Sequence, residues 1–311
     1  MLRFIAIRLL QFPLILGVIY VVTFTLAWIA PGSPFDRTER QLSPQAKQAL
    51  KERFHAEHWY SFLAYYPARI IVDGDFGPRL SDDVFTVNDT LKRGLPVSAT
   101  LGLIAITIAA VGGIFVGTLA AVRRGGALDI LSLSISLVGI SIPSFVAAAL
   151  LKALFTRQFP VLPVDGWGSP GHIILPALAL SLAPMAYISR LTRVSMIDVL
   201  SADYVRTARA KGVSRQKVIW KHCLRNAFLP VLSFLGPATA ATMTGSFVVE
   251  TIFSIPGIGE SFVNGVLNRD QTLILGTVMV YSLFLLTLNL IVDVCYALVD
   301  PRIEVGSKTP T

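Results

Sequence analysis

Few residues in this chain have the types and the spacing that catalysis or metal binding would need. The dipeptide Gly-Lys occurs nowhere in the sequence, so the Walker signature G-x-x-x-x-G-K-[ST] is absent and no nucleotide site of that kind is predicted. His55 and His58 have a spacing that could ligate a metal, but a charged surface helix explains the pair better. Cys223 and Cys295 are expected to be free thiols. The sequence therefore predicts no catalytic residue, no metal site and no cofactor bound to this chain.

The most informative stretch is a basic segment, residues 190–225. It holds nine basic residues against two acidic ones. Its pattern predicts a short helix over residues 204–211 with Asp203 as the N-cap. Gly212 fits the position where a left-handed residue ends a helix, and Ser214 would begin a second helix. A basic cytoplasmic loop would explain the charge, but not this order of helix, glycine and helix. The segment is too small for a catalytic domain, yet its first helix could insert into a groove of a partner.

A second stretch, residues 236–246, consists almost entirely of small or hydroxylated residues. Small residues let helices pack closely in lipid. The same composition would leave room for a water-filled pathway that tolerates varied solutes, and the sequence leaves both roles open. If the stretch lines a pathway, the candidate lining residues are Thr239, Thr242, Gly245 and Ser246. For Gly113 and Gly117, close helix packing is the expected role.

These stretches belong to a chain that is too apolar to be a soluble globule. Of its 311 residues, 53% are hydrophobic and 15% are charged, and the mean hydropathy is +0.65. Soluble domains are roughly 25% charged. The same composition excludes intrinsic disorder, which requires low hydrophobicity and high charge. The net charge of +8 is concentrated in a few short segments, which indicates membrane topology rather than nucleic-acid binding.

Six runs without a charged residue are candidates for membrane-spanning helices, since about 20 apolar residues cross the hydrocarbon core. The runs are continuous and do not alternate polar with apolar residues, which favours helices over barrel strands. They cover residues 9–35, 97–122, 130–151, 173–189, 226–249 and 271–292. The first run is too long for the apolar core of a signal peptide, so an uncleaved span is predicted. With six spans the basic segments share one side, and both termini are expected to be cytoplasmic.

The spans divide the chain into four parts. These are an N-terminal segment with the first span (1–35), an extracytoplasmic subdomain (36–96), a core with the other spans and the loop 190–225 (97–305), and a cytoplasmic tail (306–311). In the subdomain, helices are expected over residues 45–53, with Ser43 as the cap, and over residues 60–72, followed by a turn. The subdomain could be a packed cap on the bundle, which its charge favours, or a docking surface for an external partner.

Taken in order, several fragments resemble the permease subunits of ABC importers, in the peptide and nickel group. Residues 206–212 read Arg-Thr-Ala-Arg-Ala-Lys-Gly, which looks like the cytoplasmic EAA-type loop of peptide permeases, with Arg206 in place of the usual leading Glu. Residues 226–230 match the pattern that closes this loop. The other matching fragments are 30–35, 74–78, 142–145, 245–250, 255–259 and 300–301. Together they extend over nearly the whole chain and look most like B-type subunits of oligopeptide permeases.

The resemblance implies an all-α integral membrane protein with six transmembrane helices, the type I ABC importer permease fold, in the bacterial cytoplasmic membrane. It implies a pathway shared with a second, homologous permease subunit. It also implies two ABC ATPases that bind ATP and Mg²⁺, an extracytoplasmic protein that delivers peptide, and no nucleic acid. The cargo would be oligopeptides, with dipeptides, nickel chelates or another small solute as alternatives. The residues that couple to the ATPase would be Tyr204, Arg206, Thr207, Ala208, Arg209, Ala210, Lys211 and Gly212.

Two other classes of membrane protein explain less of the sequence. An ion-coupled secondary transporter would need inverted repeats and ionisable residues at the bilayer midplane, and neither is evident. The polar residues near the span ends are expected to anchor at the membrane interface, and they are Lys152, Arg157, Glu250, Asn289 and Asp293. A membrane scaffold or receptor without transport would leave the pattern of the basic loop unexplained.

Overall fold

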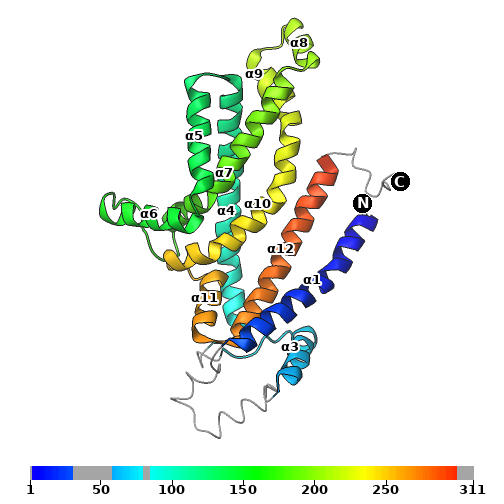
Figure 1. Cartoon of the computed structure of the whole chain (residues 1–311), viewed down its shortest axis with the longest axis vertical. Coiled ribbons are helices and arrows are strands. Elements are labelled where there is room, and N and C mark those ends of the chain that lie inside the picture. Colours follow the sequence, from blue (N-terminus) through cyan, green and yellow to red (C-terminus); the bar gives the residue numbers. More distant parts are fainter. Residues whose placement is uncertain (1, 31–57, 80–84, 300–311) are drawn as a thin grey trace.

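The computed structural model describes residues 2–30, 58–79 and 85–299, and these residues form a bundle of helices joined by short loops (Figure 1). In chain order the helices are α1 (Leu2–Ile29), α3 (Trp59–Asp73), α4 (Val87–Val122), α5 (Ala127–Ser141), α6 (Ser144–Arg157), α7 (Pro170–Leu200), α8 (Asp203–Ala210), α9 (Arg215–Lys217), α10 (Leu224–Ile252), α11 (Ile258–Asn268) and α12 (Gln271–Val299). A π-helical turn, Val218–Cys223, joins α9 to α10. The expected helix over residues 45–53 and its cap Ser43 lie outside the described residues.

Within the described part of the chain, five helical stretches are long and apolar enough to cross a membrane. They are α1, α4, α7, the continuous stretch Arg215–Ile252 and α12, and the pair α5–α6 gives a sixth if it is counted as one span. The expected single helix over residues 130–151 is wrong, because α5 and α6 are bent by 103° relative to each other. Pro143 disfavours a helical conformation at Ile142, which has φ −89° and ψ 117°, so α5 ends there.

The helices α4 and α7 extend beyond the apolar runs that predicted them. At the start of α4, Thr86 and Asp89 form a capping box, in which the Thr86 side chain accepts from the Asp89 N–H and the Asp89 carboxylate accepts from the Thr86 N–H. The helix therefore begins at Val87, well before the apolar run. Helix α7 continues past residue 189 to Leu200 and carries basic side chains with it. Both helices are longer than the roughly 20 residues that a bilayer requires.

The core of the bundle is built on the close contact of α4 with α7. A Cβ atom at Gly117 would lie 2.3 Å from the Ser189 carbonyl oxygen, and one at Gly113 would lie 2.7 Å from the Met185 carbonyl oxygen. No side chain fits at these distances, so the two backbones touch through the glycines. The expected packing role of Gly113 and Gly117 is confirmed.

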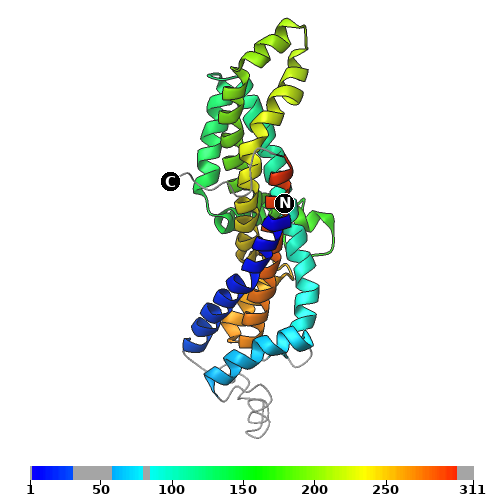
Figure 2. The same ribbon diagram turned by 90° about the vertical axis from the view of Figure 1, so that its right-hand side faces the viewer.

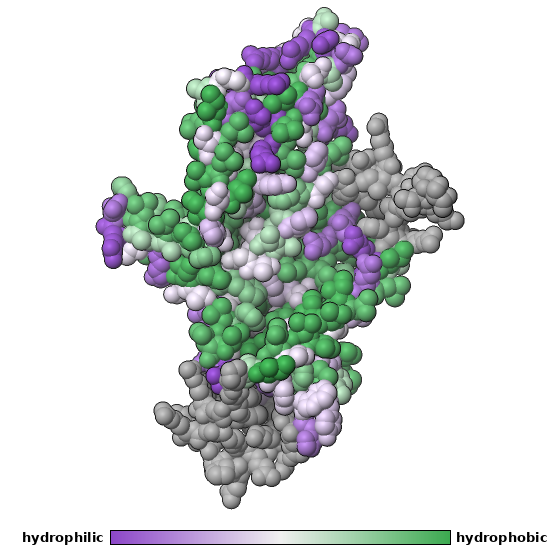
Figure 3. Space-filling view, viewed as in Figure 1, coloured by the Kyte–Doolittle hydropathy of each residue, from purple (hydrophilic) through white to green (hydrophobic). Residues whose placement is uncertain are grey.

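The two ends of the molecule differ in composition. The short helix α8 and the turn between α4 and α5 lie at one end, which we call the α8 end, and α3 and α11 lie towards the other (Figures 1 and 2). Both α1 and α12 have their chain-terminal ends directed towards the α8 end (Figure 1). Hydrophilic residues gather over α8, whereas hydrophobic residues cover much of the flanks (Figure 3). This distribution is typical of a membrane protein with a polar loop projecting from one face.

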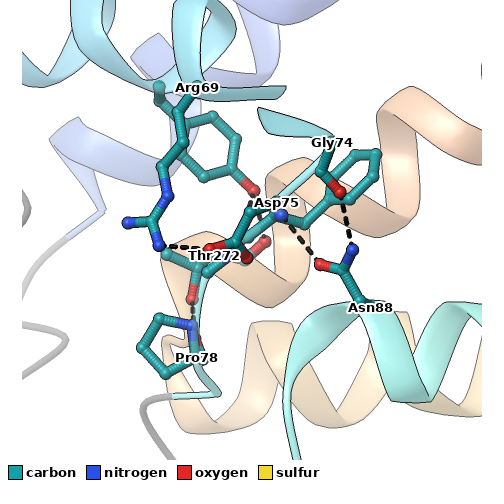
Figure 4. Close-up of polar contacts among 9 residues, drawn as sticks. Arg69, Gly74, Asp75, Pro78, Asn88 and Thr272 are labelled. Carbon is teal, nitrogen blue, oxygen red and sulfur yellow. Dashed lines mark hydrogen bonds and ion pairs between the residues drawn. The ribbon is translucent and has the colours of Figure 1, made fainter. Parts of the chain in front are cut away.

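At the opposite end, a network of hydrogen bonds fixes the turn that follows α3 (Figure 4). Gly74 ends α3 in the left-handed region, with φ +63°. The Asn88 amide donates to the Gly74 carbonyl at 2.7 Å, and the Thr272 hydroxyl donates to the Pro78 carbonyl at 2.7 Å. Tyr66 donates to the Thr272 carbonyl at 3.0 Å, and burial raises the pKa of its hydroxyl well above the ordinary value. The expected second outer helix and the turn after it are confirmed.

Candidate functional site

Helix α8 packs its apolar side against the stem of the basic loop and turns its polar side outwards. Val205 is fully buried and Ala208 is half-buried, and their spacing of three positions places both on one face of the helix. They pack in a cluster that includes Met196, Val218 and Cys223. The other expected coupling residues are exposed, namely Tyr204, Arg206, Thr207, Arg209, Ala210, Lys211 and Gly212. The helix thus presents a basic, solvent-exposed surface on a fixed apolar base.

The end of α8 is a complete Schellman motif. The Val213 N–H donates to the Ala208 carbonyl at 3.2 Å, and the Gly212 N–H donates to the Arg209 carbonyl at 2.9 Å. Gly212 has φ +78°, a conformation that residues with a side chain rarely adopt. Among the described residues, no other atom lies within 4 Å of the position of a Cβ atom there. The predicted helix end at Gly212 is confirmed.

The starts of the two loop helices differ from the expectation in detail. Ala202, not Asp203, occupies the N-cap of α8, so Asp203 is the first helical residue. Its carboxylate still interacts favourably with the helix N-terminus, and it pairs with Arg206 at 3.6 Å on the exposed surface. Ser214 holds the N-cap of α9 as predicted, although its side chain makes no capping hydrogen bond. The expected positions are therefore correct to within one residue.

The stem of the loop connects α8 directly to α10. Helix α9, the π-helical turn and α10 form one continuous helical stretch, Arg215–Ile252. The Asn226 amide donates to the Tyr204 hydroxyl at 2.9 Å, and Val205 of α8 packs in the same cluster as Val218 of the π-helical turn. Single π-helical turns inside α-helices are frequent at functional sites. Helix α8 is therefore in direct contact with the base of α10.

A buried ion pair ties α5 to α7 close to this loop. Arg193 Nε donates to Asp129 Oδ1 at 2.5 Å, and Arg193 Nη2 donates to Asp129 Oδ2 at 2.8 Å. The Gly125 N–H also donates to Asp129 Oδ2, at 2.8 Å. The Asp129 side chain is 4% exposed and the Arg193 side chain is 18% exposed. In the sequence, Arg193 is one of nine basic residues in the segment 190–225, and that count does not predict the pair. The available signal was an acidic residue, Asp129, five positions after the basic pair Arg123 and Arg124.

The four candidate pathway residues of α10 fall into two groups. Thr239 is buried and its hydroxyl donates to the Leu235 carbonyl at 2.7 Å. Ser246 is fully buried, and its hydroxyl donates to Glu250 Oε1 at 2.9 Å. By contrast, Thr242 and Gly245 line a cavity of about 320 Å³ between α10, α7 and the bend of α5 and α6. The structure thus brings Thr242 and Gly245 together at one cavity and places Thr239 and Ser246 in packed, hydrogen-bonded surroundings.

Glu250 is a buried carboxylate near the C-terminal end of α10. Its Oε2 accepts from the Gly259 N–H at 2.8 Å, and its Oε1 accepts from the Ser246 hydroxyl. Beside it, the Ser98 hydroxyl accepts from the Ile258 N–H at 2.9 Å. The expectation that Glu250 anchors at the membrane interface is wrong, because its side chain is fully buried. The N–H groups in the first turn of α11 have no carbonyl acceptor within the helix. Glu250 accepts a hydrogen bond from one of them, the N–H of Gly259.

Two of the other polar groups near the span ends, Lys152 and Asp293, form partly exposed ion pairs. Lys152 Nζ lies 2.5 Å from Asp165 Oδ1, and Asp293 Oδ2 lies 3.0 Å from Arg8 Nη2. Cys223 is free and buried. Within the described ranges, no group of three or more His, Cys, Asp or Glu residues is placed to hold a metal ion. The functional candidates are therefore α8 with its stem and the cavity beside α10.

Comparison with known proteins identifies the family of this chain. Residues 113–305 match the binding-protein-dependent transport system inner membrane components. The chain is 44% identical to the dipeptide transport system permease protein DppB of Bacillus subtilis, over 94% of each chain. It is 41% identical to the oligopeptide transport system permease protein OppB of Salmonella typhimurium, over 98% of this chain and 100% of that protein.

A solved structure supports the fold independently. The crystal structure of an amino acid ABC transporter with histidines superposes with a TM-score of 0.51, covering 67% of this chain and 92% of that chain at 18% identity. With the matches in sequence, this makes the chain a multi-pass inner membrane permease component, which is not itself catalytic. The chain belongs to the family of binding-protein-dependent inner membrane permeases, and within it to the peptide permeases.

Proposed function

We propose that this chain is one of two homologous permease subunits of an ATP-driven oligopeptide importer, and that α8 is the helix that couples it to a separate ATPase subunit. The observation that carries the proposal is the construction of α8, with a basic exposed face on an apolar base that is continuous with α10. A helix of this kind fits the groove of a partner protein. ATP and Mg²⁺ are bound by two ATPase subunits, because this chain contains no Walker signature.

The coupling works through a difference in free energy between two global states. Arg206, Arg209 and Lys211 supply polar contacts to the ATPase, and buried Val205 keeps α8 attached to its stem. When the ATPases close on ATP, they displace α8. The displacement reaches the bundle through the continuous stretch Arg215–Ile252. The buried pair of Asp129 and Arg193 makes α5 follow α7.

The proposed orientation places the α8 end in the cytoplasm, together with both chain termini. The basic turn at Arg123 and Arg124 lies at the same end (Figure 1), which agrees with the excess of Lys and Arg in cytoplasmic loops. The opposite end, with α3 and α11, then faces the extracytoplasmic peptide-binding protein. Membrane lipid surrounds the apolar flanks.

The cargo proposed here is an oligopeptide, and a dipeptide is the second candidate. Relatives named as a dipeptide permease and as an oligopeptide permease have similar identities to this chain, 44% and 41%. Uptake of labelled peptides graded from two to six residues, in a strain that lacks the chain and in one that carries it, distinguishes the two. Uptake restricted to dipeptides would replace the oligopeptide assignment, and uptake of no peptide would overturn both.

The coupling role is tested by cross-linking in the assembled transporter. Cys223 and Cys295 are first replaced by Ala, and a cysteine is then placed on α8 as Arg206→Cys. We expect it to cross-link to the ATPase subunit. The control is Tyr60→Cys, which is equally exposed but lies on α3 at the opposite end. If the cysteine at position 206 never cross-links to the ATPase, or the one at position 60 does so, the proposed role of α8 is contradicted.

A further inference from the structure

The cavity beside α10 has features of a binding site. We call it the α10 cavity. It has a volume of about 320 Å³, and its walls come from the bend between α5 and α6, from α7 and from α10. Its polar lining residues are Ser144, Tyr187 and Thr242, and Gly245 lies in the same wall as Thr242. Tyr187 of α7 stacks on Phe234 of α10, with ring centroids 4.2 Å apart, which fixes one wall. No charged residue is among those that line it.

Thr242 differs from its neighbours on α10. The hydroxyls of Thr239, Thr244 and Thr251 each donate to the carbonyl four residues earlier. Thr242 is only 5% exposed, and its buried hydroxyl has no hydrogen-bond partner among the described residues. A buried polar group without a partner destabilises the protein by roughly 1–3 kcal/mol. Thr118 and Thr192 have buried hydroxyls in the same state, but of these three threonines it is Thr242 that lines the α10 cavity.

Proline residues add backbone acceptors to the same cavity. Pro184 lies inside α7 and has no N–H, so the Leu180 carbonyl loses its helical donor, and both residues line the cavity. Pro143 breaks the helix between α5 and α6 at the same place. Within a membrane, irregular backbone is tolerated where it is buried in protein or lines a water-filled cavity. Broken helices also mark substrate sites in other transporter folds.

The chemistry of these groups matches a peptide main chain. A peptide bond presents one N–H donor and one carbonyl acceptor per residue, whatever its side chains are. Hydroxyl groups can both donate and accept, and the freed carbonyl can accept. An uncharged lining also suits varied cargo, because a fixed charge in a low-dielectric site would hold peptides of opposite charge and exclude others. Gly245 leaves room beside Ser144, whose Oγ is 3.4 Å from the position of a Cβ atom at Gly245.

We propose that the α10 cavity binds the main chain of the peptide during passage, with Thr242, Ser144 and the Leu180 carbonyl as its polar contacts. This inference rests on the proposed function and names the residues that touch the cargo. The larger cavity of about 440 Å³ near Arg8 is a weaker candidate, because Arg8 and Asp293 lie in it as an ion pair. Thr239 and Ser246 are not part of the proposed site, since their hydroxyls already have partners.

The first test removes the Thr242 hydroxyl with little change of shape. In the assembled transporter, Thr242→Val is expected to reduce the apparent affinity for every transported peptide by about fivefold, the ratio that corresponds to one ordinary hydrogen bond. The matched control is Thr244→Val, two residues along the same helix, where the hydroxyl bonds back to Ala240. An unchanged affinity in Thr242→Val, or an equal loss in both variants, would overturn the proposal.

The second test measures access and protection, so that a folding defect cannot imitate the result. A single cysteine is introduced as Ser144→Cys in the chain without Cys223 and Cys295, and is treated with a water-soluble methanethiosulfonate reagent. We expect modification that slows when a transported peptide is present and does not slow with a free amino acid. A cysteine that never reacts, or that reacts equally fast with peptide, contradicts the site. If the unmodified transporter takes up no peptide in the same membranes, the proposed function itself fails. If it does, only the site fails.

Discussion

Two buried carboxylates, near opposite ends of the bundle, are stabilised in different ways. Asp129, towards the α8 end, accepts two hydrogen bonds from Arg193 and one from the Gly125 N–H. Glu250, near the C-terminal end of α10, accepts from the Ser246 hydroxyl and from the Gly259 N–H at the start of α11. The first carboxylate is thus paired with a full opposite charge and the second with neutral donors.

The different partners of Asp129 and Glu250 indicate different structural roles for the two ends of the bundle. The pair of Asp129 and Arg193 joins α5 to α7 with a bidentate, directional contact, so the two helices move together. Glu250 joins α10 to α11 through backbone donors that belong to the fold itself, so it fixes a corner of the chain. The α8 end therefore contains a strong link between helices, and the opposite end contains a local brace.

The largest effect is expected from breaking the charge pair. Arg193→Ala leaves the Asp129 carboxylate buried without its counter-charge, which should destabilise the protein by about 3–5 kcal/mol. Thermal unfolding of the assembled transporter in detergent measures the loss. Arg190→Ala, an exposed residue on the same helix, serves as the control and should leave the unfolding temperature unchanged.

The same pair allows a rescue experiment. The double variant Asp129→Leu with Arg193→Met removes both charges and keeps apolar bulk, so it should recover much of the lost stability. It should not recover full peptide uptake, because the directional link between α5 and α7 is gone. Full uptake by the double variant would show that the link has no role in coupling.

A smaller effect is expected at Glu250. Glu250→Ala leaves the Gly259 N–H without an acceptor, at a cost of about 1–3 kcal/mol, while the Ser246 hydroxyl keeps the Met243 carbonyl as its acceptor. Glu250→Gln keeps one carbonyl oxygen and should lose less than Glu250→Ala. Unfolding temperatures of the two variants test this order. If Glu250→Gln were as damaging as Arg193→Ala, the distinction between neutral and charged partners would be wrong.

The smallest effect is expected from loss of the exposed cap at the start of α4. Asp89 caps α4 together with Thr86, and its hydrogen bonds are open to solvent. Thr86→Ala should destabilise the protein by about 1 kcal/mol, the usual value for loss of an N-cap. Hydrogen exchange at the first turn of α4 is the suitable measurement. A loss as large as that of Glu250→Ala would mean that burial does not set the order of these effects.

The sequence predicted local features well and distant pairings poorly. The end of α8 at Gly212 depends on hydrogen bonds that span at most five residues, so its signal lies within one short window. The contact of Asp129 with Arg193 joins residues 64 positions apart, and Ser98 meets Ile258 across 160 positions. Neither pairing has a local pattern. The break at Pro143 did have a local signal, but the length of the apolar run outweighed the proline in the prediction.

The four candidate pathway residues of α10 show the same division between what a local pattern predicts and what depends on distant neighbours. Composition indicated that residues 236–246 could pack or line a pathway, and it could not separate the faces of one helix. The structure separates them, because Thr242 and Gly245 meet α7 and the bend of α5 and α6 at the cavity, while Thr239 and Ser246 are hydrogen-bonded within the fold. Which residues of α10 face the cavity depends on how α10 packs against α7 and against the bend of α5 and α6. This packing has no local signal in the sequence.

The most direct measurement is the number of peptides taken up per ATP hydrolysed by the reconstituted transporter, compared between Gly212→Val and Gly74→Val. Both glycines end a helix with positive φ and have open space at the Cβ position among the described residues, so valine adds similar backbone strain at each. Gly212 lies at the end of α8, and Gly74 ends α3 at the opposite end of the molecule. We predict that Gly212→Val lowers the ratio while ATP hydrolysis persists, and that Gly74→Val keeps the wild-type ratio. An unchanged ratio in Gly212→Val, or an equal fall in both variants, would contradict coupling through α8.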